Sequence, residues 1–147
     1  MKAEAVHLLR FFQTGMQCLI PIYQRTYSWT DEQCDALWSD ILKVGTHQNI
    51  PTHFVGSFVY IQDSNVHLLG ATPQYMVIDG QQRITTISLL LLAISNVIEE
   101  NGGELLLQDN FRITPTYIKN NYLLNSNEEG ERRFKLILNL LSLSPLS

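Results

Sequence analysis

The sequence of 147 residues has few of the features that mark secreted, zinc-binding or membrane-spanning proteins. Its two cysteines, Cys18 and Cys34, form no C-x-x-C pair, and its four histidines lack H-x-x-x-H or Cys/His ligand spacing. We therefore expect a reduced, cytoplasmic protein without zinc. Residues 1–10 contain no continuous apolar segment of the secretory type. The longest apolar-rich run, Ile84–Ile98, is interrupted by polar residues and is too short to cross a bilayer, which predicts a buried helix and no membrane partner.

Positive charge is also scarce. The net charge is −4 and the pI is about 5.5, so no overall positive field attracts nucleic acid. The basic cluster Arg132, Arg133 and Lys135 is shorter than the runs of about five or more that form nucleic-acid patches, and we interpret it as solvated surface. No lysine occupies the G-x-x-x-x-G-K position, which excludes a Walker-type nucleoside triphosphatase loop in this segment.

Hydrophobic patterning predicts an α+β fold, a small mixed sheet with flanking helices. Pro21 lacks a backbone N–H, so its segment is predicted to be an edge strand or a strand entry. Thr30 and Gln33 match a capping box, and the apolar stripe that follows assigns Trp38 to the core rather than to a cofactor platform. The predicted helices span 3–13, 31–45, 84–100 and 116–124; the predicted strands span 19–23, 54–61, 66–69, 75–78 and 134–138.

The junction between the strand ending at Ile78 and the following helix is the candidate site. Gly80 lets a ligand approach the backbone, and a helix N-terminus attracts anions. Arg83 offers a permanently charged fork for phosphate oxygens, and two hydroxyls and two amides are close by. The alternative is structural: Asp79 caps the helix and Arg83 pairs with a surface carboxylate. The candidate residues of this turn are Asp79, Gly80, Gln81, Gln82, Arg83, Thr85 and Thr86.

A second cluster, Ile20–Trp29, places an amide, a guanidinium and aromatic rings in a loop after the first strand. Gln24 and Arg25 are candidates for phosphate binding, and Tyr27 and Trp29 for base or cleft contacts. The structural alternative is that both rings hold the following helix against the core. His53 is a further candidate for lining the cleft.

Together these segments resemble a bacterial family of unknown function found at the N-terminus of GmrSD-type modification-dependent restriction enzymes. The resemblance rests on I-P-x-Y-Q-R-x-Y-x-W at Ile20–Trp29, F-x-G-S-hydrophobic at Phe54–Phe58 and I-D-G-Q-Q-R-hydrophobic-T-T at Ile78–Thr86. It continues through 121–124 and 133–138, so it covers about residues 3–138. We therefore expect a domain over 1–138 and an irregular tail over 139–147, which we interpret as a probable truncation.

The resemblance implies a ParB/sulfiredoxin-like fold with a strand-turn-helix phosphate site at Asp79–Arg83. It further implies nucleoside triphosphate binding, and hydrolysis as a hypothesis, in partnership with DNA cleavage by a separate nuclease domain that this chain lacks. Asp79, Gln82 and Arg83 are then the catalytic candidates, and Asp79 would contact Mg²⁺ brought by the nucleotide. Sulfiredoxins have a catalytic cysteine in this turn, so the glutamines argue against sulfinic acid reduction. The alternatives are a ParB-like DNA-binding or nuclease module and a remnant without activity of its own.

Overall fold

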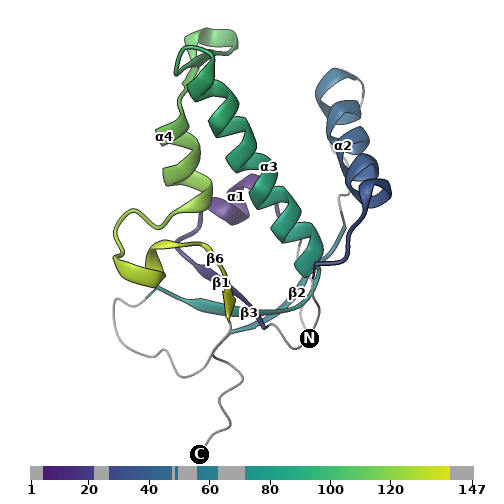
Figure 1. The fold of residues 1–147 in the computed structure, drawn as a ribbon, viewed down its shortest axis with the longest axis vertical. Helices are drawn as coiled ribbons and strands as arrows, with labels where there is room; N and C mark the ends of the chain where they lie inside the picture. Colours follow the sequence, from purple (N-terminus) through teal and green to yellow (C-terminus); the bar gives the residue numbers. More distant parts are fainter. Residues whose placement is uncertain (1–4, 22–26, 48, 50–55, 63–71, 140–147) are drawn as a thin grey trace, which may run out of the picture.

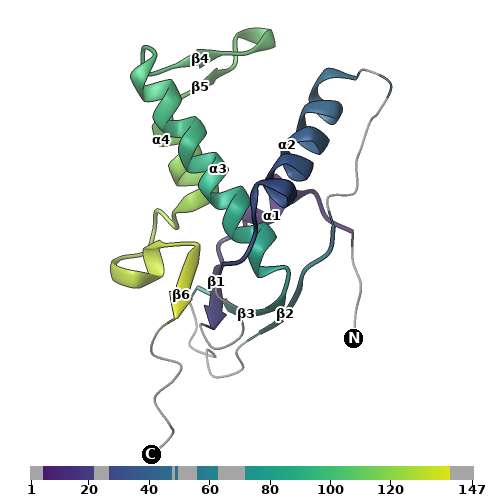
Figure 2. The same ribbon diagram turned by 45° about the vertical axis from the view of Figure 1, so that its right-hand side comes forward.

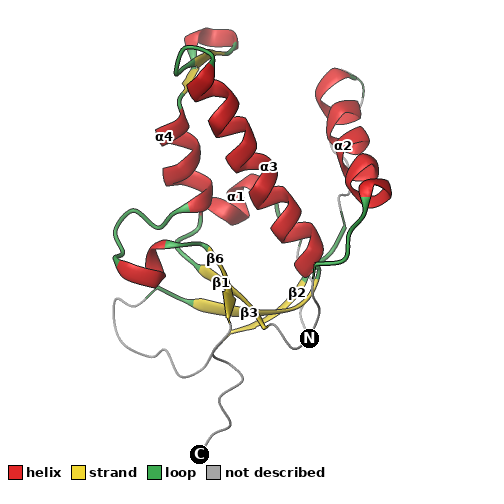
Figure 3. Cartoon of the chain, in the orientation of Figure 1, coloured by secondary structure: helices red, strands yellow, loops and turns green. Residues whose placement is uncertain are grey.

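The computed structural model describes residues 5–21, 27–47, 49, 56–62 and 72–139. They form a four-stranded mixed sheet with helices on one side of it (Figures 1 and 3). A two-stranded hairpin, β4–β5, lies at the far end of the longest helix (Figure 2). The strands are β1 (Gln17–Pro21), β2 (Val59–Gln62), β3 (Gln74–Asp79), β4 (Leu105–Leu106), β5 (Arg112–Ile113) and β6 (Leu136–Asn139). The helices are α1 (Leu8–Gln13), α2 (Asp31–Thr46), α3 (Gln81–Glu100) and α4 (Pro115–Ile118), which continues as a π-helical turn over Lys119–Leu123.

The sheet has the strand order β2-β3-β1-β6, with β1 parallel to both β3 and β6 and β2 antiparallel to β3. The prediction that the Pro21 segment is an edge strand or a strand entry is therefore wrong, since β1 lies between two strands and Pro21 ends it. Pro21 is the last residue of β1, beyond the register with β3, which ends at the pair Leu19 and Met76. A proline at the end of a strand removes a hydrogen-bond donor only where the ladder is ending, so both sides of β1 can still be paired.

The core lies between the sheet and the helices. Its largest fully buried side chains are Phe12 and Met16 from the α1 region, Val77 from β3 and Ile84 from α3. The aromatic ring of Phe11 packs on that of Phe58 with a centroid distance of 4.6 Å, and Tyr60 continues this aromatic cluster towards Tyr75. The cluster fixes the segment before β2 against α1, and this segment contributes to the site described below.

Helix α2 begins where the sequence predicts it. Thr30 is the N-cap, and Gln33 Oε1 accepts hydrogen bonds from the Thr30 backbone N–H at 2.8 Å and from its hydroxyl at 2.7 Å. The assignment of Trp38 to the core is wrong, because Trp38 is 45% exposed, as is Leu42. Leu37 is the buried residue of this helix. Only one side of the apolar stripe meets the core, since α2 diverges from α3 along its length (Figure 2).

Helix α3 confirms the predicted helix that ends at Glu100, but it begins at Gln81 rather than at Ile84, because Gly80 is its N-cap, and it is not buried all round. Ile84, Ile87 and Ile98 are buried, whereas Leu89 and Val97 are 55% and 57% exposed. A helix of this length extends roughly 30 Å, further than the short strands beneath it, so its outer half has no sheet to cover it. No helix in the described part of the chain is long and apolar enough to cross a membrane.

The last described elements lie within two residues of their predicted positions. The helical segment over 116–124 is present as α4 and its π-helical extension, and the strand over 134–138 is present as β6. The strand proposed for 66–69 and residues 54–55 of the one proposed for 54–61 lie outside the described residues, whereas residues 56–58 are not part of a strand and β2 begins at Val59. Residues 8–13 confirm the second half of the N-terminal helix, whereas residues 5–7 are not helical and His7 is the extended N-cap.

Candidate functional site

The candidate site is the turn that joins β3 to α3. Gly80 is the N-cap of α3 and has a left-handed backbone conformation, with φ 86° and ψ 14°. The Gly80 backbone N–H donates to the Asp79 carboxylate at 3.0 Å, and the Gly80 carbonyl accepts from the Ile84 N–H at 3.1 Å. Asp79 is exposed. The Asp79 carboxylate therefore accepts a backbone hydrogen bond on the solvent-exposed side of the turn, next to the positive end of the α3 dipole.

Gly80 is required for steric reasons as well as for its conformation. A Cβ atom added there would lie 2.7 Å from Phe58 Cβ and 3.1 Å from the Ser57 carbonyl oxygen. The segment before β2 thus packs directly on the turn. Since the aromatic cluster anchors Phe58 to α1, this close contact fixes the position of the turn relative to the core.

Arg83 packs on the same segment. Its Nη1 donates a hydrogen bond of 2.7 Å to the Ser57 carbonyl oxygen. Its guanidinium lies so close to Gly56, at φ 126°, that an added Cβ would be 2.4 Å from Arg83 Cζ. Among the described residues, no carboxylate pairs with Arg83. An arginine has five N–H donors, so the contact with Ser57 orients the fork and leaves donors for another acceptor.

The two glutamines of the turn are buried. Gln81 is 7% exposed and its Nε2 donates to the carbonyl oxygens of Ile78 at 2.9 Å and Val77 at 3.3 Å. Gln82 is 9% exposed and its Oε1 accepts from the Ser28 backbone N–H at 2.8 Å. Through these hydrogen bonds Gln81 links the end of β3 to the start of α3, and Gln82 links the loop before α2 to the turn.

The aromatic residues of that loop play two different parts. The Tyr27 hydroxyl is 2.8 Å from Thr86 Oγ1 and 3.6 Å from Cys34 Sγ, and the residue is 47% exposed. Trp29 is half-buried and packs against the core, as its structural alternative predicts. Tyr27 therefore lies beside the turn with its ring accessible, whereas Trp29 anchors the loop.

Three segments distant in the sequence therefore meet at the N-terminus of α3. They are 27–28, 56–58 and 79–86, and each was part of a motif in the sequence. Thr85, which the sequence also proposed, is at the start of the second turn of α3 and is partly exposed. Gln24, Arg25 and His53 lie outside the described residues, so their place relative to the turn stays a prediction.

The comparison with family models now identifies the chain. The model described as the N-terminal domain of the GmrSD restriction endonuclease matches residues 8–145. The chain belongs to the GmrSD N-terminal domain family. This match extends beyond Leu138, where the sequence analysis placed the end of the resemblance. No curated protein matches the chain.

The contacts around the turn add residues to the site that sequence reasoning did not include. Gly56, Ser57 and Phe58 form one wall of the turn, and the Ser28 backbone joins it through Gln82. The glycine of the F-x-G-S motif was the available signal, because a glycine inside an apolar segment often marks a close backbone approach.

Proposed function

We propose that this chain is a nucleoside triphosphate-binding regulatory domain of a restriction or phage-defence protein, with the phosphates bound at Asp79–Arg83. The observation that carries the proposal is the orientation of Arg83 by Ser57 and Gly56 at the positive end of α3, without a carboxylate partner in the described residues. A guanidinium and a helix N-terminus together favour a phosphate group. The family's link to a restriction endonuclease supports the biological setting.

The proposed fold is ParB/sulfiredoxin-like, and the proposed roles differ among the turn residues. Arg83 and the helix dipole would stabilise the charge of the terminal phosphate. Asp79, which is exposed, would orient a water molecule or contact Mg²⁺ that arrives with the nucleotide. Gln82 is better suited to positioning the loop that contains Tyr27 than to contacting water, because its side-chain oxygen already accepts from Ser28.

A magnesium ion fits this site only as a partner of the phosphates. No group of three or more His, Cys, Asp or Glu side chains is placed to hold a metal ion in the described part of the chain. Magnesium bound to a nucleotide needs only one or two protein carboxylates, because phosphate oxygens and water complete its shell. When bound, it would neutralise phosphate charge, and Asp79 would be its protein contact.

Direct titration tests the proposal. GTP, ATP, CTP and UTP are each titrated with magnesium into the natural chain and into Arg83→Ala, with Arg112→Ala as the control. Arg112 is 67% exposed and its pair with Glu104 is on the β4–β5 hairpin, so its removal changes the net charge equally without touching the turn. We expect at least one nucleotide to bind the natural chain and the control equally, and to bind Arg83→Ala at least tenfold more weakly. Equal affinity in all three proteins, or no binding by any nucleotide, would contradict the proposal.

Hydrolysis and DNA binding are separated in the same proteins. If nucleotide is hydrolysed, Asp79→Ala is expected to lower the rate; an unchanged rate removes Asp79 from the mechanism. If the chain instead binds duplex DNA with a steep salt dependence and ignores nucleotides, the DNA-binding alternative replaces the one proposed here.

A further inference from the structure

A pocket lies at the N-terminal ends of the parallel strands, whereas the Asp79–Arg83 turn lies at the C-terminal end of β3. Gly15, Thr72 and Lys135 line it, and these residues lie just before β1, β3 and β6 respectively. Because the three strands are parallel, their N-terminal ends lie together at one end of the sheet, whereas the turn follows the C-terminal end of β3. A six-residue strand such as β3 is roughly 20 Å long, which is the separation between the pocket end and the turn end of the sheet. The pocket has a volume of about 420 Å³ and is distinct from the candidate site.

Lys135 contributes a buried positive charge to this pocket, so its interpretation as solvated surface in the sequence analysis is wrong. The residue is 4% exposed, and its Nζ donates to the Thr14 carbonyl oxygen at 2.8 Å. In the described part of the chain, no carboxylate pairs with this ammonium. An ammonium has three N–H donors, and a buried charge with a single neutral acceptor is poorly compensated. Burial lowers the pKa of Lys135, and the neighbouring Cys18 partly offsets this effect.

The walls of the pocket supply further donors in a fixed frame. The amide side chains of Gln13, Asn120 and Asn127 line it and are exposed. Asn125 holds the wall in place, since its Nδ2 donates to the carbonyl oxygens of Met16 at 3.0 Å and Arg132 at 3.2 Å. The arrangement therefore combines one buried cation with several neutral N–H donors, which is the chemistry that recognises an oxyanion.

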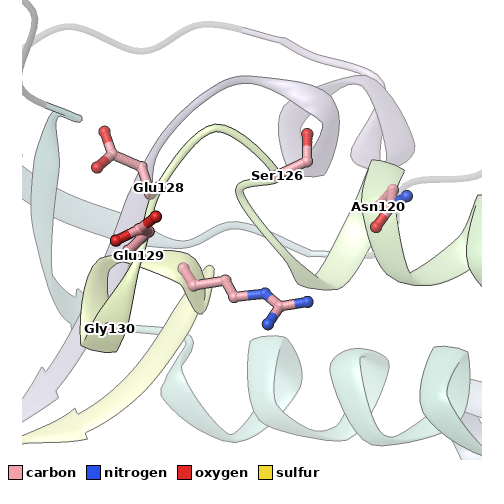
Figure 4. Close-up of a pocket in the computed structure, with 6 residues that line it drawn as sticks. Asn120, Ser126, Glu128, Glu129 and Gly130 are labelled. Carbon is pink, nitrogen blue, oxygen red and sulfur yellow. The ribbon is translucent and has the colours of Figure 1, made fainter.

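The acidic residues near the pocket limit the negative charge that its ligand can have. Glu128 lines the pocket, but its carboxylate accepts from the Thr72 hydroxyl rather than pairing with Lys135. In an adjoining hollow of about 470 Å³, Glu128 and Glu129 lie on one side, across from Asn120 and Ser126 (Figure 4). Arg133 also lines this hollow, so its two carboxylates face one guanidinium, and the remaining negative charge disfavours a polyanion such as DNA. The volumes of the pocket and of the adjoining hollow are both in the range of small-molecule sites.

We propose that this pocket is a second ligand site, independent of the Asp79–Arg83 turn, which binds the phosphate or carboxylate group of a small metabolite against Lys135 and the surrounding amides. A free anion and an anion attached to a larger molecule share this chemistry. The glutamates of the adjoining hollow accept hydrogen bonds, so a ligand with N–H or O–H donors beyond its anionic group would gain additional contacts there.

The test uses inorganic phosphate, acetate and adenosine monophosphate as probes, each titrated into the full chain at constant ionic strength set with KCl. Lys135→Met is the test variant, and Lys43→Met, exposed on α2, removes the same charge elsewhere. We expect saturable binding of at least one probe, unchanged in Lys43→Met and at least tenfold weaker in Lys135→Met. Tighter binding of the monophosphate than of inorganic phosphate would assign the anion to a larger ligand, and equal binding would assign it to a free anion.

Three results would overturn the inference. They are the absence of saturable binding beyond the KCl control, equal binding by a folded Lys135→Met protein, and loss of binding in Arg83→Ala, which would attribute the response to the turn. If Lys135→Met does not fold, side-chain amide NMR signals of the natural chain decide instead, because those of Asn120 and Asn127 must shift with the probe and those of Gln33 on α2 must not. Failure here leaves the nucleotide proposal untouched, since that proposal depends on Arg83.

Discussion

The conformation of Gly80 gives the sharpest test of the site's geometry, through the substitution Gly80→Ala. An L-residue in the left-handed region costs roughly 1–2 kcal/mol. The added Cβ would also lie 2.7 Å from Phe58 Cβ and 3.1 Å from the Ser57 carbonyl oxygen, and relieving such overlap in a packed region costs roughly 1–3 kcal/mol. We therefore expect the free energy of unfolding to fall by about 2–5 kcal/mol.

The assay is urea denaturation of the natural chain, Gly80→Ala and Gly45→Ala. Gly45 is in α2, a Cβ added to it would meet no atom within 4 Å, and it is not among the glycines with positive φ. Alanine there should raise stability by up to about 1 kcal/mol, because glycine weakens a helix. The same chemical change is thus expected to have opposite signs at the two positions. If Gly80→Ala were within about 0.5 kcal/mol of the natural chain, the reasoning about this turn would be refuted.

Three further predictions concern the parts around the turn. Gln82→Ala leaves the Ser28 N–H without its acceptor and should cost about 1–3 kcal/mol in denaturation, whereas Gln82→Glu keeps an acceptor and should cost less; equal losses would contradict this role. On α3, Ile87→Ala should cost about 2–5 kcal/mol and Leu89→Ala less than about 1 kcal/mol, because they are 4% and 55% exposed; similar losses would mean that the outer face is covered. Burial raises the pKa of Cys18 from 9.0 to about 12, so the unfolded thiol ionises first and stability should fall as pH rises from 9 towards 12, by up to about 1.4 kcal/mol per pH unit. Cys18→Ala should show a shallower decline over this window, and an equal slope would argue against a buried thiol.

Local sequence signals predicted the elements that depend on neighbouring residues. The capping residues Thr30 and Gln33 set the start of α2, and the Asp79–Gly80 pair set the junction between β3 and α3. In both places the chain's own side chains and backbone conformation satisfy the element ends, so no distant contact is needed to identify them.

The errors arose where distant segments decide the outcome. Pro21 appeared to favour an edge strand, but β6, more than a hundred residues later, pairs with β1 on its second side. The exposure of Trp38 depends on how far α2 diverges from the core, which helical periodicity alone does not determine. Helical periodicity also does not show how much of the length of α3 the sheet can cover.

The site itself was predictable in location but not in its internal contacts. The turn at Asp79–Arg83 could be identified from the sequence, whereas the contact of Arg83 with Ser57 joins residues 26 positions apart and that of Gln82 with Ser28 joins residues 54 positions apart. The burial of Gln81 and Gln82 could not be anticipated, because glutamine is usually exposed. Because both glutamines make hydrogen bonds within the protein, we expect the ligand to contact Arg83 and Asp79 rather than the glutamines.

The central claim is that Arg83 at the start of α3 binds nucleotide phosphate, and thermal denaturation with and without GTP, ATP, CTP or UTP plus magnesium tests it most directly. A ligand at about 100 times its Kd stabilises the folded state by about 2.7 kcal/mol, which for a chain of this size corresponds to about 5–10 °C in Tm. The account predicts such a rise for at least one nucleotide in the natural chain and its loss in Arg83→Ala. A cooperatively folded natural chain whose Tm is unchanged by all four nucleotides, or an equal rise in both proteins, would contradict it.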